Sequence, residues 1–128
     1  MNDRSSLRVL VVEDEPLIRW SITETLARMG HTVIEADDAE SAIRTLRDMP
    51  EPADVVLLDY RLPGSNDLAL LATIRRLAPH SAVIMMTAYG TPDVTSSALE
   101  LGAYGVVDKP FDMQDLEPML LHAYAATR

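Results

Sequence analysis

Short apolar runs alternate with longer segments of helical periodicity five times along the chain, and this alternation constrains the fold more than any other feature. The apolar runs are rich in Val, Ile and Leu, and most do not alternate with polar residues, as expected for strands buried on both faces. They cover Leu7–Val12, Thr32–Ala36, Val55–Leu58, Ala82–Met86 and Gly105–Val107. The alternation predicts an α/β fold with right-handed crossovers and a parallel sheet that has helices on both faces.

Each helical segment begins with a cap or a proline, and most end at a glycine or a proline. These signals predict helices from Pro16 to Gly30, from an Asp37–Glu40 capping box, over about Leu68–Ala78, from a Thr91 cap to Gly102, and from Asp112 onward. The stripes expected to face the sheet are Ile18, Ile22 and Leu26; Ala39, Ala42, Ile43 and Leu46; Leu70, Ile74 and Leu77; Val94, Ala98 and Leu101; and Leu116, Leu120 and Ala123.

Pro118 leaves two alternatives for the last helix. If Asp112 is the cap, Pro118 lies about six residues inside the helix and kinks it, because proline removes a backbone hydrogen bond. Alternatively, the regular helix begins near Glu117 after a looser turn. Elsewhere, Trp20 is expected to pack partly against a neighbour, and His31 is expected to be solvated.

The length and the charge limit the class of protein. With 128 residues, one domain over 1–128 is expected, with a core of about 7–124. The chain has no cysteine, which excludes disulfide scaffolds, thiolate zinc sites and cysteine nucleophiles. A net charge of −9 argues against direct nucleic-acid binding. The apolar runs are too short to span a membrane and no signal peptide is evident, so a soluble cytoplasmic protein is expected.

Polar residues follow four of the strands, at the edge where parallel α/β sheets bind ligands. Glu13 and Asp14 follow the first strand, Asp59 the third, Thr87 the fourth, and the single lysine, Lys109, the fifth. Crowded carboxylates repel by about 4 kcal/mol per pair at about 4 Å, and Mg²⁺ or Mn²⁺ would remove that cost. Each residue alone has a structural explanation, such as helix capping. Together they are the parts needed for phosphoryl transfer onto Asp59.

Four segments resemble the receiver domain of bacterial two-component response regulators. They are VLVVEDEP at 9–16, VVLLDYRLPG at 55–64, IMMTAYG at 84–90 and GAYGVVDKPFD at 102–112. The match covers about Leu7 to Tyr124. It implies a single (βα)5 unit, a doubly wound parallel five-stranded sheet of the flavodoxin-like kind.

The resemblance also implies a phosphorylation site. Asp59 would accept a phosphoryl group from a sensor histidine kinase or a histidine phosphotransfer protein. Asp14 and Asp59 would bind Mg²⁺ directly and Glu13 would bind it through water, while the backbone carbonyl of Arg61 would complete the protein ligands. Such a receiver catalyses only its own phosphorylation and dephosphorylation, so it is a signalling module rather than a metabolic enzyme.

Further roles follow from the same resemblance. Lys109 would pair with the phosphoryl group, and its peptide bond to Pro110 would be cis. Thr87 would move toward the phosphoryl group and bias the domain to its active state. Backbone N–H groups of Tyr60 and Ala88 would support the phosphoryl oxygens.

The chain departs from the receiver pattern at its switch residues. Receivers commonly carry an aromatic residue three positions before the conserved lysine, where this chain has Val106. Tyr104 would face the same side of a strand, two residues earlier. Arg61 and Tyr89 occupy variable positions that are expected to tune the rate of dephosphorylation. In the loop Leu62–Asp67, Asp67 replaces a glycine and is expected to make a firmer helix cap.

Other functions and partners remain as alternatives. A degenerate receiver would bind partners without phosphorylation, but all five expected polar site residues are present. An aspartyl-nucleophile phosphatase usually needs a second Asp two residues after the nucleophile, and Arg61 stands there. The fourth helix, fifth strand and fifth helix are the usual signalling face of such receivers, so homodimerisation through this face is compatible with the resemblance.

Overall fold

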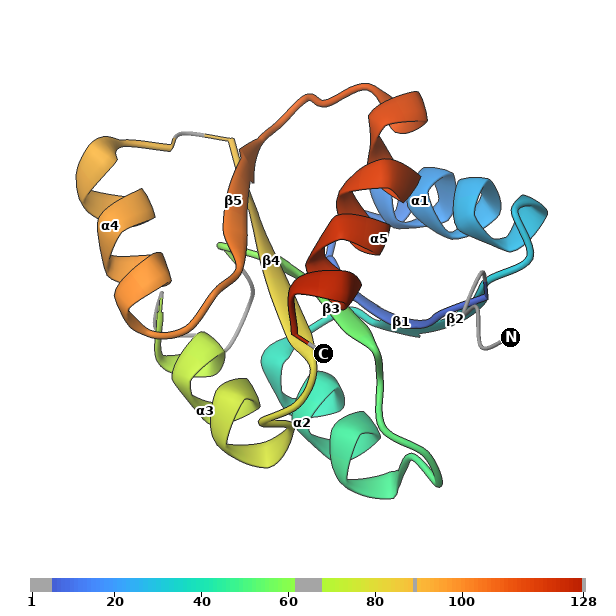
Figure 1. Cartoon of the computed structure of the whole chain (residues 1–128), viewed down its shortest axis with the longest axis horizontal. Coiled ribbons are helices and arrows are strands. Elements are labelled where there is room, and N and C mark those ends of the chain that lie inside the picture. The colour runs from blue at the N-terminus through green and yellow to red at the C-terminus, as the bar shows by residue number, and fades with distance from the viewer. Residues whose placement is uncertain (1–5, 62–67, 89, 128) are drawn as a thin grey trace.

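The computed structural model describes residues 6–61, 68–88 and 90–127, in which five parallel strands form one sheet. The strands are β1 (Arg8–Val12), β2 (Thr32–Ala36), β3 (Val55–Asp59), β4 (Ala82–Thr87) and β5 (Gly105–Asp108). Their spatial order is β2-β1-β3-β4-β5 (Figure 1). The first crossover leads to one side of β1 and the later ones to the other, so the predicted doubly wound α/β fold is confirmed.

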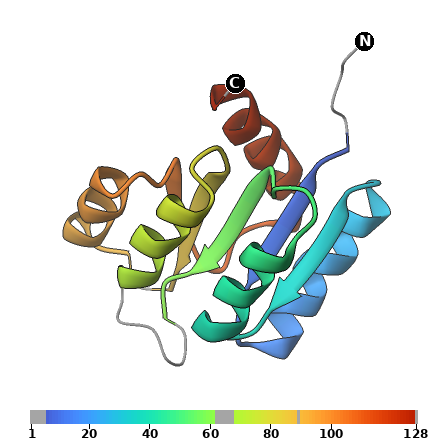
Figure 2. The same cartoon turned by 90° about the horizontal axis from the view of Figure 1, so that it is seen from below.

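Helices cover both faces of the sheet. They are α1 (Pro16–Arg28), α2 (Ala39–Asp48), α3 (Ala69–Leu77), α4 (Pro92–Glu100) and α5 (Leu116–Ala126), with a 3-10 turn, η1 (Met113–Asp115), before α5. Figure 2 shows α1 and α5 on one face and α2, α3 and α4 on the other. Each face has its own apolar cluster, built on alternate residues of the same strands.

Burial in the sheet depends on the position of the strand. The three central strands β1, β3 and β4 are buried along almost their whole length, as predicted. The edge strands β2 and β5 are largely half-buried or exposed, so the expectation of strands buried on both faces is wrong for them. Each has a hydrogen-bonded neighbour on one side, and the helices cover it incompletely.

The start of α2 differs from the sequence interpretation, and the start of α5 decides between the two alternatives left open for it. The capping box of α2 uses Asp38 and Ser41, one residue later than predicted: the Ser41 N–H donates to Asp38 Oδ1 over 2.7 Å. This backbone hydrogen bond, followed by one from the Ser41 hydroxyl, lowers the pKa of Asp38. Regular α5 begins at Leu116 after η1, which confirms the alternative of a looser turn before a helix that starts near Glu117. Pro118 therefore lies in the first helical turn, where a missing N–H costs nothing.

Several side chains lie differently from their predicted environments. Leu77 and Leu101 were placed in the inward stripes, but they are 39% and 40% exposed at the ends of their helices. Trp20 is 59% exposed on α1, more than partial packing implies. His31 is buried rather than solvated: its Nδ1 accepts the Leu7 N–H over 2.9 Å. Its Nε2 lies 2.7 Å from Glu117 Oε2.

Candidate functional site

Three carboxylates meet at the carboxyl edge of the sheet. Glu13 and Asp14 follow β1, and Asp59 ends β3, which pairs directly with β1. One carboxylate oxygen from each lies within 4.8 Å of the others. Glu13 and Asp59 are buried, and Asp14 is exposed. The predicted convergence depends on β1 and β3 being neighbours, and the sheet order confirms it.

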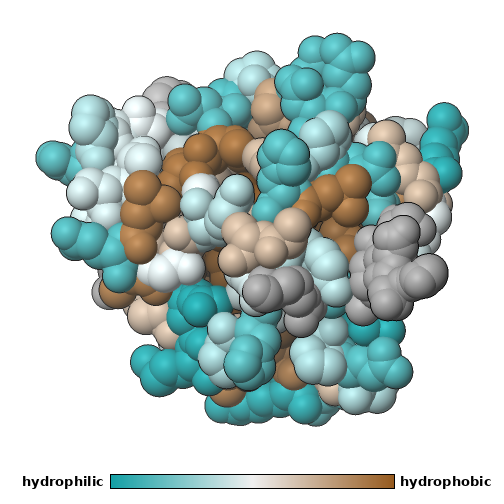
Figure 3. Space-filling view, in the orientation of Figure 1, coloured by the Kyte–Doolittle hydropathy of each residue, from teal (hydrophilic) through white to brown (hydrophobic). Residues whose placement is uncertain are grey.

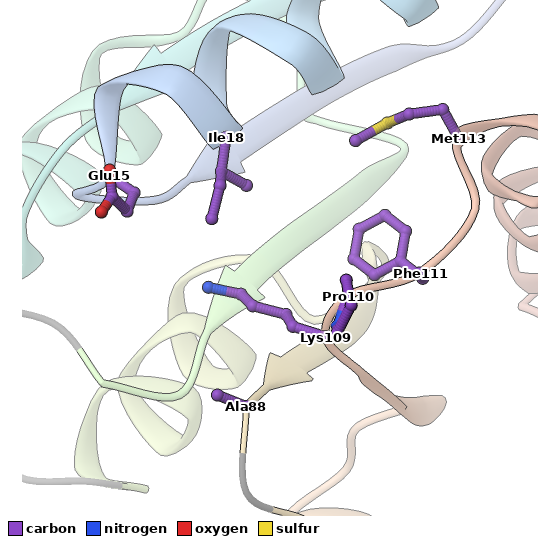
Figure 4. A pocket seen from close by; sticks show the side chains of 7 residues that line it. All are labelled: Glu15, Ile18, Ala88, Lys109, Pro110, Phe111 and Met113. Atoms are coloured by element: carbon purple, nitrogen blue, oxygen red, sulfur yellow. The ribbon is translucent and has the colours of Figure 1, made fainter.

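Lys109 reaches the same point from β5. Its ammonium donates to Glu13 Oε1 over 2.8 Å and lies 3.1 Å from Asp59 Oδ1. Figure 4 shows this side chain extending from the loop after β5 toward the carboxyl end of β3. The Lys109 N–H also donates to the carbonyl of Thr87 over 2.8 Å, which ties the loop to β4. The peptide bond from Lys109 to Pro110 is cis, as the resemblance implies.

The charges in the cluster alter the acidity of its members. Burial and, after it, the negative charge of Glu13 raise the pKa of Asp59, Lys109 opposes both, and the net pKa is about 6. For Lys109, burial lowers the pKa, but hydrogen bonds to Glu13 and Asp59 outweigh it and the net pKa is raised. Lys109 therefore stays an ammonium at neutral pH, and Asp59 ionises at some cost.

The donor set fits a hard divalent cation. Three carboxylates offer oxygen ligands without nitrogen or sulfur, which suits Mg²⁺ or Mn²⁺ rather than zinc. The positive charge of a bound cation would offset the free-energy cost of ionising Asp59. Because Asp14 is exposed, one side of the cluster is open to solvent. Arg61, whose backbone carbonyl is a predicted ligand, lies two residues after the end of β3 and is exposed.

Thr87, Ala88 and Tyr60, the predicted hydrogen-bond donors to a phosphoryl group, lie at the same edge of the sheet but differ in exposure and in bonding. Thr87 is the last residue of β4 and is 2% exposed. Ala88 follows it and is exposed. The Tyr60 N–H donates to the carbonyl of Met86 over 2.8 Å, extending the β3–β4 ladder. That amide is therefore already used, which disagrees with its expected role as a donor to phosphoryl oxygens.

The predicted switch residues have separate environments. Val106, on β5, is half-buried against the cluster that α2, α3 and α4 cover. Tyr104 lies just before β5 and is 43% exposed. The Arg61 guanidinium lies 5.9 Å from the centre of the Tyr60 ring. Tyr89 and the loop 62–67, including Asp67, lie outside the described residues.

An apolar pocket of about 450 Å³ opens beside Lys109. It lies between the start of α1 and the segment from Lys109 to Met113 (Figure 4). Ile18, Phe111 and Met113 line one side, and Ala88 lies across from them. The sequence interpretation did not assign Phe111 or Met113 to the site. Their position directly after the lysine, in the segment KPFDM, was the signal that pointed to them.

The fold and the site define a class: an α/β domain with an acidic pocket and an opposing lysine at the carboxyl edge of a five-stranded parallel sheet. The family model for the response regulator receiver domain matches residues 9–121. The chain belongs to this family, whose members are signalling modules of two-component systems. In the described part of the chain, no helix combines the length and the apolar character needed to cross a bilayer.

Two relatives of this chain are much longer proteins. The chain is 37% identical over 109 residues to response regulator protein FleR of Pseudomonas aeruginosa, covering 85% of this chain and 23% of FleR. It is 36% identical over 107 residues to the DNA-binding transcriptional regulator NtrC of Escherichia coli, covering 84% of this chain and 22% of NtrC. The chain thus spans less than a quarter of these two relatives.

Solved structures show the same fold. A CheY-like receiver domain protein from Methanospirillum hungatei superposes with a TM-score of 0.88 at 26% identity, covering 96% of this chain and 97% of that one. NtrX from Brucella abortus gives a TM-score of 0.86 at 32% identity, covering 95% of this chain and 28% of NtrX. The flavodoxin-like topology predicted from the sequence is therefore confirmed.

Proposed function

We propose that this receiver is phosphorylated on Asp59 in a Mg²⁺-dependent reaction and that it takes the phosphoryl group from a sensor histidine kinase or a histidine phosphotransfer protein. The observation that carries the proposal is the contact of the single lysine with Glu13 and Asp59 beside a third carboxylate. A helix cap or a solvated acidic surface does not require this arrangement.

The proposed reaction moves a phosphoryl group between two residues. An Asp59 carboxylate oxygen attacks the phosphorus of the donor phosphohistidine, the new O–P bond forms, and the N–P bond breaks with its electrons returning to the imidazole. Lys109 would leave one of its carboxylates to pair with a phosphoryl oxygen. The buried Thr87 hydroxyl would donate to another oxygen, and Ala88, being small, would leave access to Asp59.

Asp14, Asp59, Glu13 and the Arg61 carbonyl would hold the cation, which supplies positive charge where the phosphoryl oxygens gather. Arg61 and Tyr89 would tune the lifetime of the aspartyl phosphate. With Val106 at the usual aromatic position, Thr87 would not be coupled to an aromatic residue there. Phosphorylation would then shift the population of the active state less than in receivers with that aromatic residue.

The pocket beside Lys109 supports a donor that approaches over α1. Leu17 and Trp20 are 71% and 59% exposed on α1, close in sequence to the pocket residue Ile18. An apolar surface next to a phosphoryl-accepting carboxylate suits a protein donor better than a small molecule, because it offers area for docking. With a net charge of −9, this chain would not bind nucleic acid directly. We place it in the cytoplasm, as one receiver unit over residues 1–128.

Exposed apolar residues near α4 and β5 support a homodimer. Leu99, Leu101 and Tyr104 are each at least 40% exposed on α4 and just before β5. Figure 3 shows apolar surface over β5 and beside α4. Phosphorylation would favour pairing through α4, β5 and α5. Light scattering with and without acetyl phosphate tests this, and Leu99→Arg is expected to keep the protein monomeric; a monomer under both conditions would contradict the dimer.

Acetyl phosphate provides a direct test of phosphorylation. With Mg²⁺, intact mass spectrometry should show one added phosphoryl group that is lost in alkali. Chelation of the metal should abolish it, and Asp59→Asn should not be labelled. If the wild-type protein takes up no phosphate, the chain is a degenerate receiver, and labelling of Asp59→Asn would place the acceptor elsewhere.

A further inference from the structure

Arg19 links the acidic loop after β1 to the neighbouring strand β2. Its Nη1 donates to the backbone carbonyl of Glu13 over 2.8 Å, and its Nε donates to Glu35 Oε1 over 3.0 Å. The Arg19 side chain is 21% exposed and that of Glu35 is 45% exposed, so water competes less for the part-buried bond to Glu13 than for the bond to Glu35. A planar guanidinium can make both bonds at once in a fixed direction, whereas an ammonium cannot reproduce that fork.

Other hydrogen bonds hold the remaining polar groups of Glu13, whose carbonyl accepts from Arg19. The Glu13 N–H donates to the carbonyl of Ala36 over 3.0 Å. Its carboxylate accepts Lys109 on one oxygen and the Glu15 N–H on the other, over 2.8 and 3.1 Å. Arg19 adds the anchor on the carbonyl, so every polar group of Glu13 has a partner.

The next residue, Asp14, depends on this anchor. The carbonyl of Glu13 and the nitrogen of Asp14 lie in one planar peptide unit, so fixing the carbonyl fixes where the Asp14 backbone leaves the loop. Asp14 is exposed, and within the described part of the chain no hydrogen bond or ion pair to another residue holds its carboxylate. The position of that carboxylate is therefore set through its backbone.

We propose that Arg19 is a positioning residue of the cation site, which acts by holding the Glu13–Asp14 peptide so that the Asp14 carboxylate faces Asp59. The proposal rests on the proposed Mg²⁺ site and adds to it a residue that contacts neither the cation nor the phosphoryl group. Losing a partner that orients a metal ligand typically weakens metal binding by about 10- to 100-fold.

The sign of the effect separates this role from a simple effect of charge. Arg19 is a cation near a cation site, so removing it should strengthen Mg²⁺ binding if only its charge matters. A positioning role predicts the reverse. A role in stability alone would lower the melting temperature and leave the Mg²⁺ affinity of the folded protein unchanged.

Calorimetric titration of the unphosphorylated protein with MgCl₂ tests the proposal. Arg19→Met keeps the side-chain length but loses the fork and the charge, and we expect a dissociation constant roughly 10-fold higher. Arg19→Lys keeps the charge and should weaken binding severalfold. The matched control is Arg28→Met on the same helix, where the side chain is 81% exposed. It removes the same charge at a distance from the site and should bind Mg²⁺ at least as tightly as the wild type.

The outcomes separate this proposal from the proposed function. Wild-type protein that binds no Mg²⁺ would overturn both. If the wild type binds Mg²⁺ and is phosphorylated, but Arg19→Met and Arg19→Lys bind as tightly or more tightly, the positioning role is wrong. If Arg19→Met does not fold, the result for Arg19→Lys decides. Rates with acetyl phosphate should recover at saturating Mg²⁺; rates that stay low with unchanged affinity would also overturn the proposal.

Discussion

Replacing Asp59 with asparagine should stabilise the metal-free protein at neutral pH, although it removes the proposed phosphorylation site. Burial and the charge of Glu13 raise the pKa of Asp59 from 3.8 to about 6, despite the ammonium of Lys109 at 3.1 Å. The ionised carboxylate is therefore less favourable in the folded chain than in the unfolded chain. Asparagine has nearly the same shape and carries no charge at any pH.

The size of the effect follows from linkage between protonation and folding. A pKa of about 6 in the folded state against 3.8 in the unfolded state corresponds to about 3 kcal/mol. The folded state binds the proton more tightly, so this stability is present below pH 3.8 and is lost as the pH rises through 6. At pH 4.5, about a third of it is lost. The pKa of about 6 already includes the attraction of Lys109, so we expect Asp59→Asn to gain ~1–3 kcal/mol at pH 7.5.

Urea unfolding followed by far-ultraviolet circular dichroism, with EDTA at pH 7.5 and at pH 4.5, measures this gain. The stabilisation should shrink to roughly a third or less at pH 4.5. Glu100→Gln, an exposed carboxylate at the end of α4, is the control and should change stability by less than about 0.5 kcal/mol. The reasoning is refuted if Asp59→Asn is no more stable than the wild type at pH 7.5, or if its gain is equal at both pH values.

Three further substitutions test other parts of the structure. His31→Ala should lower the free energy of unfolding in urea by about 2–4 kcal/mol, because it leaves the Leu7 N–H and Glu117 without their buried partner. The control, exposed His80→Ala, should be near neutral, and an equal loss of stability in both variants would contradict the prediction. Gly90→Ala should destabilise the fold by about 1–3 kcal/mol and slow labelling by acetyl phosphate, because the methyl group of the alanine would meet the side chains of Asp108 and Thr87. If both the melting temperature and the labelling rate are unchanged, the loop has room for the methyl group. Pro118→Ala should leave Mg²⁺-dependent phosphorylation unchanged, because the proline lies in the first turn of α5; loss of labelling would contradict that placement.

The site was predictable because its residues follow strands that the alternation of elements predicts to be parallel. Asp59 and Lys109 lie 50 positions apart, yet parallel strands must bring their carboxyl ends to one edge. Strands β3 and β4 each run one residue further than predicted, and Asp59 and Thr87 are their last residues. In the sequence, a polar side chain marks the end of each apolar run, although the backbone of that residue still continues the ladder.

The contacts of His31 and Arg19 could not be predicted in the same way. His31 meets Glu117, which is 86 positions away and lies on a helix whose start the sequence left open. Arg19 reads as a surface residue of an amphipathic helix, because its partner at Glu13 is a backbone carbonyl and a backbone group has no sequence signature. Leu77 shows the opposite error: helical periodicity placed it inward, but α3 ends there and the sheet no longer covers it.

The pairing of β4 with β5 also fixes the sign of the charge that faces Asp59. Thr87 pairs with Asp108, and Lys109 is the next residue. A slip of β5 by a single position would turn its side chains to the other face and bring Asp108 or Pro110 into the place of the ammonium. One neighbour would add a fourth carboxylate, and the other would add no charge. Phosphorylation of this chain would thus depend on the register of the edge strand β5 against β4 to within one residue.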